Sequence, residues 1–167
     1  MLQKGKQEPE TFQINDAIRE VVQLLHSEAV GRNAALAVDL PAGLPAVWAG
    51  RVEFQQVMVN LLLNALDAVR GVPLDRREIL VQTRPSPDAV VVAVRDRGCG
   101  LPSPDFNSIF EPFFTTKSSG LGMGLAICRR MIQAYGGRIW AANNEDAGAT
   151  VSFSLPSAAA HRESSHD

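Results

Sequence analysis

The feature that most constrains the fold is the segment 51–70, which contains no Gly or Pro and is dense in Val, Leu, Met and Ala. A segment of this length makes about five turns, so we expect a long central helix. Its polar residues recur three or four positions apart and share one narrow stripe: Glu53, Gln56, Asn60, Asn64 and Asp67. The stripe is either the hydrated side of an amphipathic helix or, because amide and carboxylate oxygens suit Mg²⁺, part of a metal and phosphate site.

The rest of the chain alternates between helical spacing and short β-rich runs bounded by turn residues. In chain order these predict a helix from Asn15 or Asp16 to Gly31, a strand at 35–40, strands at 78–84 and 89–96, a helix at 122–135, and strands at 137–143 and 149–155. The later strands pair as two hairpins. Helices in separated blocks and strands in hairpins favour an α+β fold, a two-layer sandwich with its helices on one face of a mixed, mostly antiparallel sheet.

Length and composition set the class of protein. The 167 residues fit one domain, expected at 11–155, with an N-terminal tail or join at 1–10 and a flexible C-terminal tail at 156–167. The net charge of -2 disfavours nucleic acid as the main partner. Apolar runs stay well below the roughly 20 residues that span a bilayer. Two cysteines are too few for a disulfide framework, which fits a reducing cytosol.

A second motif follows the Val-rich strand at 89–96. Asp96 ends this strand, and Gly98 and Gly100 follow it in a loop. A buried carboxylate can accept a hydrogen bond from an exocyclic amine, and glycines let the backbone approach a flat ligand. Asp followed by Gly is also ordinary turn chemistry, so the motif alone leaves both interpretations open.

A third motif places glycines at alternate positions, 120, 122 and 124, directly before a predicted helix. Free backbone N–H groups at a helix N-terminus form a phosphate cradle, although a flexible hinge has the same composition. The chain contains no GxxxxGK[ST] segment, and the glycines do not match the GxGxxG dinucleotide fingerprint. The preceding FEPFFTTK segment is expected to anchor the loop through its Phe residues and to place Lys117 near the phosphates.

Five segments resemble, in order and spacing, the N, G1, F and G2 boxes and the closing strand of the ATP-binding catalytic domain of sensor histidine kinases. They are QQVMVNLLLNALDAV, DRGCGLP, FEPFFTTK, GLGMGLAICRRMIQAYGGRIWAAN and GATVSFSLP. That domain belongs to the gyrase, heat-shock chaperone and mismatch-repair ATPase superfamily, so the resemblance implies a sandwich of the Bergerat type over 11–155. FEPFFTTK, with few residues before the glycines, is similar to the short-lid subfamily of nitrogen-regulation and oxygen-sensing kinases.

The resemblance implies a site for ATP and Mg²⁺. Asn64 would bind the metal, Asn60 would lie close to the metal and phosphates, and Asp96 would hold the adenine amino group. The other ATP-binding residues that it implies are Gly98, Gly100 and Thr150 around the base, and Lys117, Gly120, Gly122, Gly124 and Leu125 along the triphosphate. Asp67 is acidic where the family often has a basic residue, so we expect it to contact the metal or a water molecule.

The resemblance also bears on the reaction. The superfamily's hydrolases and serine kinases place a Glu one turn before the metal-binding Asn as general base, whereas this chain has Asn60, whose amide cannot take a proton. We therefore expect a protein-histidine kinase domain with Asn60 as its catalytic residue. The acceptor should lie elsewhere, because none of the three histidines stands in an H-E-x-x-x-P context: His26, His161 and His166.

The expected partners are the histidine-bearing dimerisation domain of the same kinase and a response regulator downstream. We expect a cytoplasmic, monomeric domain that contacts neither nucleic acid nor membrane. Two alternatives stay open. The first alternative to a histidine kinase domain is a stand-alone ATPase or anti-sigma-type serine kinase of the same superfamily. The second is a nucleotide-binding regulatory module without catalysis.

Overall fold

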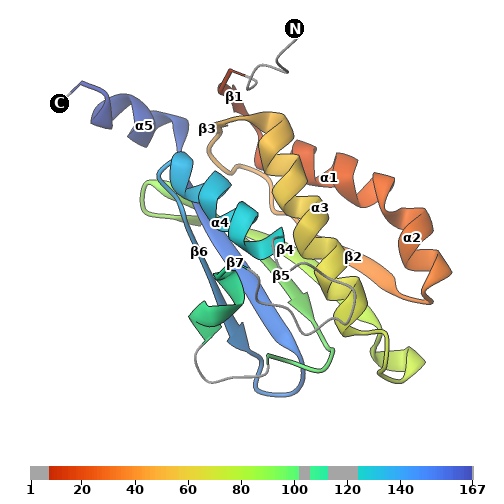
Figure 1. Ribbon diagram of the computed structural model, residues 1–167. Coiled ribbons are helices and arrows are strands. Elements are labelled where there is room, and N and C mark those ends of the chain that lie inside the picture. Colours follow the sequence, from red (N-terminus) through yellow and green to blue (C-terminus); the bar gives the residue numbers. More distant parts are fainter. Residues whose placement is uncertain (1–7, 102–105, 113–123, 167) are drawn as a thin grey trace, which may run out of the picture.

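The computed structural model describes residues 8–101, 106–112 and 124–166, and it has two layers (Figure 1). One layer is a five-stranded sheet in the order β2 (Ala35–Asp39), β4 (Glu78–Ser86), β5 (Ala89–Asp96), β7 (Ala149–Pro156) and β6 (Arg138–Asn143). β2 pairs with β4 in parallel, and the other neighbours are antiparallel. The expected mixed, mostly antiparallel sheet is therefore confirmed.

The second layer consists of helices that cover one face of this sheet (Figure 1). These helices are α1 (Ile14–Leu24), α2 (His26–Gly31), α3 (Arg51–Ala68) and α4 (Gly124–Ala134), with short 3-10 turns η1 (Leu74–Arg76) and η2 (Phe106–Phe110). A further helix, α5 (Ala158–Ser164), lies beyond one end of the sheet. α3 is the predicted central helix. It packs between α1 and α4 and lies against β4 and β5.

The core lies between the helix layer and the sheet. α3 buries the apolar side opposite its polar stripe, including Met58, Leu62 and Leu66. From the sheet, alternate residues of β5 point into the same core, among them Val92 and Val94. Burial of these side chains at about 25 cal/mol per Å² is the main force that holds α3 against the sheet.

Both predicted hairpins form. β4 and β5 pair from Ile79 with Asp96 to Ser86 with Ala89, so the connection has only two residues, Pro87 and Asp88. Asp88 takes a left-handed conformation with φ 59°, which an acidic turn residue tolerates. This register decides which residues end β5, and it places Asp96 at the last position of the strand.

The first predicted helix differs from the structure at its start. Gln13 is the N-cap residue, and no side chain caps the helix. Asn15 is instead buried, where its amide donates to the carbonyl oxygen of Pro41 at 2.8 Å and accepts from the Thr83 hydroxyl at 2.8 Å. A buried amide must satisfy its hydrogen-bonding groups, so Asn15 links α1 to β4 rather than capping it. The helix also divides at Leu25 into α1 and α2, which ends at Gly31 as expected.

The segment at 156–167 differs most from its expectation of a flexible tail, because it contains α5. The Ser157 hydroxyl caps α5 by accepting from the Ala160 N–H at 3.1 Å. The Ala158 N–H donates to the carbonyl of Ala46 at 2.8 Å. The His161 ring stacks on Trp48, with centroids 3.8 Å apart. These contacts order a segment whose sequence has no apolar periodicity.

A small second sheet also lay outside the sequence predictions. β1 (Glu10–Phe12) pairs antiparallel with β3 (Val47–Ala49), and Val47 bridges to Ser157. Strands of three residues are too short to show an alternating pattern. Within the described ranges, none of the helices is long and apolar enough to cross a bilayer.

Candidate functional site

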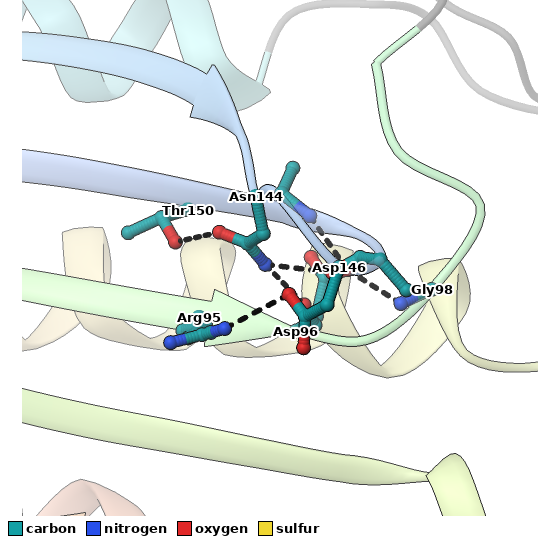
Figure 2. A network of polar contacts seen from close by, with 8 residues as sticks. Arg95, Asp96, Gly98, Asn144, Asp146 and Thr150 are labelled. Carbon is teal, nitrogen blue, oxygen red and sulfur yellow. Dashed lines mark hydrogen bonds and ion pairs between the residues drawn. The ribbon is translucent and has the colours of Figure 1, made fainter.

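Asp96, at the end of β5, is the centre of the candidate site (Figure 2). The residue is only 7% exposed. Oδ1 accepts the backbone N–H groups of Gly98 at 2.9 Å and Ala149 at 3.3 Å, whereas Oδ2 receives no bond from the described residues. Burial raises the pKa of Asp96, and the two N–H groups oppose that rise. Asp96 is therefore an oriented hydrogen-bond acceptor: the two N–H groups hold Oδ1, and no described residue donates to Oδ2.

Two glycines let the backbone close around this carboxylate. A Cβ at Gly98 would overlap the carbonyl of Ala68, the last residue of α3. Gly148 has φ +77°, and a Cβ there would lie 2.7 Å from Asp96 Oδ1. Only glycine fits at both positions, so the floor of the site is made of bare backbone. Gly98 was expected there, whereas Gly148 was not singled out, since its turn resembles any other glycine turn.

The loop after β5 continues along the end of β6. Gly100 takes φ +77°, and a Cβ on it would lie 3.0 Å from Asn143 Oδ1. That oxygen accepts the Leu101 N–H at 2.7 Å. Gly100 is therefore close to β6, with a conformation that favours glycine. Residues 102–105 lie outside the described chain.

The side chain of Thr150, which the resemblance places around the base, lies on the opposite face of the sheet from that of Asp96. It pairs with Arg95 across β5 and β7, and directly paired residues share a face, so its side chain points away from the core side on which Asp96 lies. Its hydroxyl donates to Asn144 Oδ1 at 2.6 Å. The residue that meets the Asp96 carboxylate is its neighbour Ala149. Among the described residues, Asn144 links Thr150 to the site.

The polar stripe of α3 divides into parts with different partners. Glu53 accepts the Tyr135 hydroxyl at 2.9 Å. Asn60 is half-buried, and its amide donates to Cys128 Sγ of α4 at 3.7 Å. Burial raises the pKa of the Cys128 thiol to about 11, so the sulfur stays a neutral thiol at physiological pH. Asn64, one turn further, is also half-buried and has a polar or electrostatic partner of its own. The two amides share one face of the helix.

Asp67 completes the stripe and meets an arginine. Its Oδ1 lies 2.6 Å from Arg32 Nη1 and 3.6 Å from Arg70. Arg32 also pairs with Glu28, and its hydrogen bond to Asp67 is the main cause that raises the pKa of the guanidinium. The ion pair ties α3 to the residue after α2. The expected contact of Asp67 with a metal or water stays a prediction.

α3 and the Asp96 loop meet at one point, which brings the two halves of the site together. The Cys99 N–H donates to Ala68 O at 3.3 Å. Asn64 precedes Ala68 by one turn, about 6 Å along the helix axis. A ligand whose flat ring lies at Asp96 can therefore extend polar groups along α3 toward Asn64.

The phosphate side is only partly described. Lys117, Gly120 and Gly122 lie outside the described residues, whereas Gly124 and Leu125 form the first turn of α4. Leu125 is half-buried and packs against the core. In η2, Ile109 and Phe110 are buried, and this turn contacts α4 and β6. Phe110 thus anchors the described part of the loop, as expected of its aromatic residues.

The amide oxygens of Asn60 and Asn64 suit an Mg²⁺ ion that is bound together with phosphates. The described part of the chain has no cluster of three His, Cys, Asp or Glu residues that would enclose a metal. A site with one or two amide oxygens suits a metal that keeps several waters and takes its other ligands from phosphates, which is the usual habit of Mg²⁺. Bare backbone beside a buried carboxylate likewise suits a planar base that carries an amino group.

A surface groove of about 550 Å³ lies between α1, α3 and α4. Its lining is mostly apolar and includes the exposed side chains of Leu24 and Ile127. Asn60 also lines this groove, so one residue joins the groove to the polar face of α3. Sequence reasoning did not find the groove, because it depends on how three helices pack together in the fold.

Comparisons with known proteins identify relatives that match most of the chain. Residues 50–159 match the family described as histidine kinase-, DNA gyrase B-, and HSP90-like ATPases. The sensor protein FixL of Bradyrhizobium diazoefficiens is 40% identical over 156 residues, which cover 93% of this chain and 30% of FixL. The sensor histidine kinase TmoS of Ectopseudomonas mendocina is 32% identical over 141 residues, 83% of this chain and 14% of TmoS. The chain thus spans less than a third of either curated relative.

Solved structures agree with this assignment. The nucleotide-free catalytic domain of histidine kinase ThkA superposes with a TM-score of 0.78 at 33% identity, covering 90% of this chain and 96% of that one. Full-length ShkA in complex with AMPPNP has a TM-score of 0.76 at 26% identity, covering 89% of this chain and 31% of ShkA. The chain therefore belongs to the histidine kinase-, DNA gyrase B-, and HSP90-like ATPase family, within which it is an ATP-binding catalytic domain of the sensor histidine kinase type.

Proposed function

We propose that this domain binds Mg²⁺-ATP and transfers the γ-phosphoryl group to a histidine on a separate dimerisation domain, with a response regulator as the later acceptor. The observation that carries the proposal is the junction of Asp96 with α3. A buried carboxylate with one available oxygen lies next to the helix that presents Asn60 and Asn64. A complex of ThkA with a response regulator protein supports the downstream partner.

In this proposal Asp96 Oδ2 accepts a hydrogen bond from the adenine amino group. The N–H groups of Gly98 and Ala149 hold the carboxylate in place from Oδ1. A guanine would turn a carbonyl oxygen toward the same carboxylate and be repelled. The base site is thereby selective for an amino group.

Asn64, with Asn60 beside it, would hold Mg²⁺ on the polar face of α3. The metal, when bound, supplies charge neutralisation of the phosphates, which together with positioning accounts for nearly all catalysis of phosphoryl transfer. Lys117, Gly120 and Gly122 are proposed to contact the triphosphate, with Gly124 and Leu125 at the start of α4.

Asn60 determines which acceptor the domain serves. Its amide donates to a neutral thiol and cannot accept a proton from water or a hydroxyl. An acceptor that brings its own nucleophilic nitrogen, a histidine, needs no such base from this domain. The proposal therefore favours a histidine kinase over a hydrolase or serine kinase with a carboxylate at this place.

We propose that the acceptor helix docks on the groove between α1, α3 and α4. The acceptor must reach the phosphate near Asn60, and Asn60 lines this groove. Leu24 is 71% exposed there and Ile127 38%, so both residues present apolar surface at the groove. An amphipathic helix laid in such a groove would cover them.

The proposal is tested with γ-labelled ATP and the purified chain, alone and mixed with histidine-bearing dimerisation domains of sensor kinases. The lone chain is expected to bind Mg²⁺-ATP, hydrolyse it very slowly and acquire no acid-labile phosphate. An accepting dimerisation domain is expected to become labelled on its histidine. Rapid hydrolysis or self-labelling by the lone chain would instead assign it to the hydrolases or serine kinases.

A further inference from the structure

The side chain of Asn144, directly after β6, forms hydrogen bonds with three groups: the main-chain carbonyls of Asp96 and Ala147 and the hydroxyl of Thr150 (Figure 2). Its Nδ2 donates to Asp96 O at 2.9 Å and to Ala147 O at 2.9 Å. Its Oδ1 accepts the Thr150 hydroxyl at 2.6 Å. Two carbonyl oxygens fix which end of the amide faces them, because an amide oxygen in that place would be repelled. Both ends of the side chain are therefore committed.

The turn that begins at Asn144 lies directly on Asp96. The Asn144 N–H donates to Gly148 O at 2.9 Å and closes the turn. Gly148 approaches Asp96 so closely that a Cβ would overlap it, and the next residue, Ala149, donates its N–H to Asp96 Oδ1. Asn144 thus holds Asp96 in two ways, directly at the main-chain carbonyl and indirectly through the N–H group that orients the carboxylate.

A second link joins the same turn to β5 without reaching Asp96. Arg95 Nη2 lies 3.0 Å from Asp146 Oδ1, and these side chains are 43% and 51% exposed. Exposed pairs of this kind contribute little to stability, because water screens them. The ion pair therefore holds the turn loosely, whereas the half-buried Asn144 amide acts at the carboxylate itself.

We propose that Asn144 is a positioning residue for purine recognition: its amide fixes Asp96 and the turn at 144–148 so that Asp96 Oδ2 faces the amino group of the base. The inference rests on the proposed function, in which that amino group belongs to adenine. It adds a residue that does not touch the nucleotide and yet sets how well the domain distinguishes a 6-amino purine from one that lacks the group.

Two matched substitutions in one turn test this role. Asn144→Asp keeps the size of the side chain but removes both donated hydrogen bonds, and Asp146→Asn makes the reverse exchange two residues away. Calorimetry with ATP and with purine ribonucleoside triphosphate, which lacks the 6-amino group, measures the selectivity of each protein. Thermal unfolding of the ligand-free domain shows whether each variant folds, and Asn144→Ser replaces Asn144→Asp if the added charge prevents folding.

We expect Asn144→Asp or Asn144→Ser to lower the affinity for ATP about 3- to 10-fold, as for loss of one oriented hydrogen bond, with a much smaller change for the analogue. Asp146→Asn should leave both affinities unchanged. An equal loss for the two nucleotides would overturn the inference, because it would show that Asn144 only supports the fold. If the unsubstituted domain binds both nucleotides equally, or neither, the proposed adenine site itself is wrong.

Discussion

The backbone N–H of Cys99 donates to the carbonyl oxygen of Ala68 at 3.3 Å, and this contact joins the loop after β5 to the last residue of α3. Two residues, Arg97 and Gly98, lie between Asp96 and Cys99, and a Cβ on Gly98 would overlap the same carbonyl. This backbone contact joins the loop of the proposed base site to the helix that carries the proposed metal site.

Replacing Gly98 with Ala should disturb both sites. The added Cβ overlaps the Ala68 carbonyl, so the loop or the helix end must shift, at a cost of about 1–3 kcal/mol as in other overpacked positions. Urea unfolding and ATP calorimetry measure the two effects. Gly71→Ala is the matched control, because a Cβ there meets nothing within 4 Å. An unchanged ATP affinity in Gly98→Ala would separate the loop from the binding site.

Asp96→Asn should lower the affinity for ATP about 10- to 100-fold, because a hydrogen bond to a charged acceptor contributes roughly 1.5–3 kcal/mol. The fold should persist, since the Asn oxygen can still accept from Gly98 and Ala149, while the new amino group faces the amino group of adenine. Calorimetry with ATP and GTP checks this. Equal affinity of the unsubstituted domain for the two nucleotides would contradict the assignment of Asp96.

The affinity for ATP should also depend on pH through Asp96. Because burial raises its pKa, the carboxylate takes up its proton at a higher pH than an ordinary Asp as the solution is acidified. ATP affinity should fall over that range, and Asp96→Asn should lack this fall. The free energy of unfolding should change with pH in the opposite direction to the ATP affinity. The raised pKa of Asp96 contributes stability at low pH, and this contribution is lost as the pH rises through the folded-state pKa. Titrations of both proteins from pH 8 downward, at about 0.1 M salt to limit long-range effects, compare the two curves.

Asn64→Ala should abolish the part of ATP binding that depends on Mg²⁺ and leave the fold intact, because Asn64 lies on the polar side of α3 and not among its buried residues. Binding is measured with Mg²⁺ and with a chelator. Gln56→Ala, two turns earlier on the same stripe and exposed, controls for a general loss of polar surface. Full Mg²⁺-dependent binding in Asn64→Ala would mean that the stripe is only a hydrated helix face.

Leu24→Asp should reduce phosphoryl transfer to a dimerisation domain without changing the affinity for ATP, because a charge in the groove between α1, α3 and α4 opposes burial under an apolar helix. Leu74→Asp is the control, since Leu74 is 65% exposed in η1, outside the groove. Rates of histidine labelling measure transfer. Equal rates for the two variants would place the docking surface elsewhere.

Sequence periodicity was sufficient for the elements that carry long patterns. α3 and the two hairpins were predicted because a continuous apolar helix and alternating strands leave clear spacing in the sequence. β1, β3 and α5 were missed because each is short and is ordered by contacts between distant residues, such as the stacking of His161 on Trp48. Asn15 looked like a cap because its partner, Thr83, is far away in the sequence.

In the site, motif reasoning found the residues that lie next to Asp96 along the chain but misplaced a residue that depends on register. Thr150 was assigned to the base, yet its pairing with Arg95 turns the side chain to the opposite face, a parity that only the register determines. Asn144 and Gly148 were missed for a related reason. They matter because the turn between β6 and β7 packs against Asp96, and the sequence of a turn does not indicate which distant residue it contacts.

The three-residue strand β3 has a mechanical consequence. The N-terminal strand β1 pairs along it, and α5, near the other end of the chain, rests on its Trp48. Gly50 alone separates β3 from α3. A displacement of β1 or of α5 is therefore expected to shift β3 and, through Gly50, the start of the helix that carries Asn60 and Asn64.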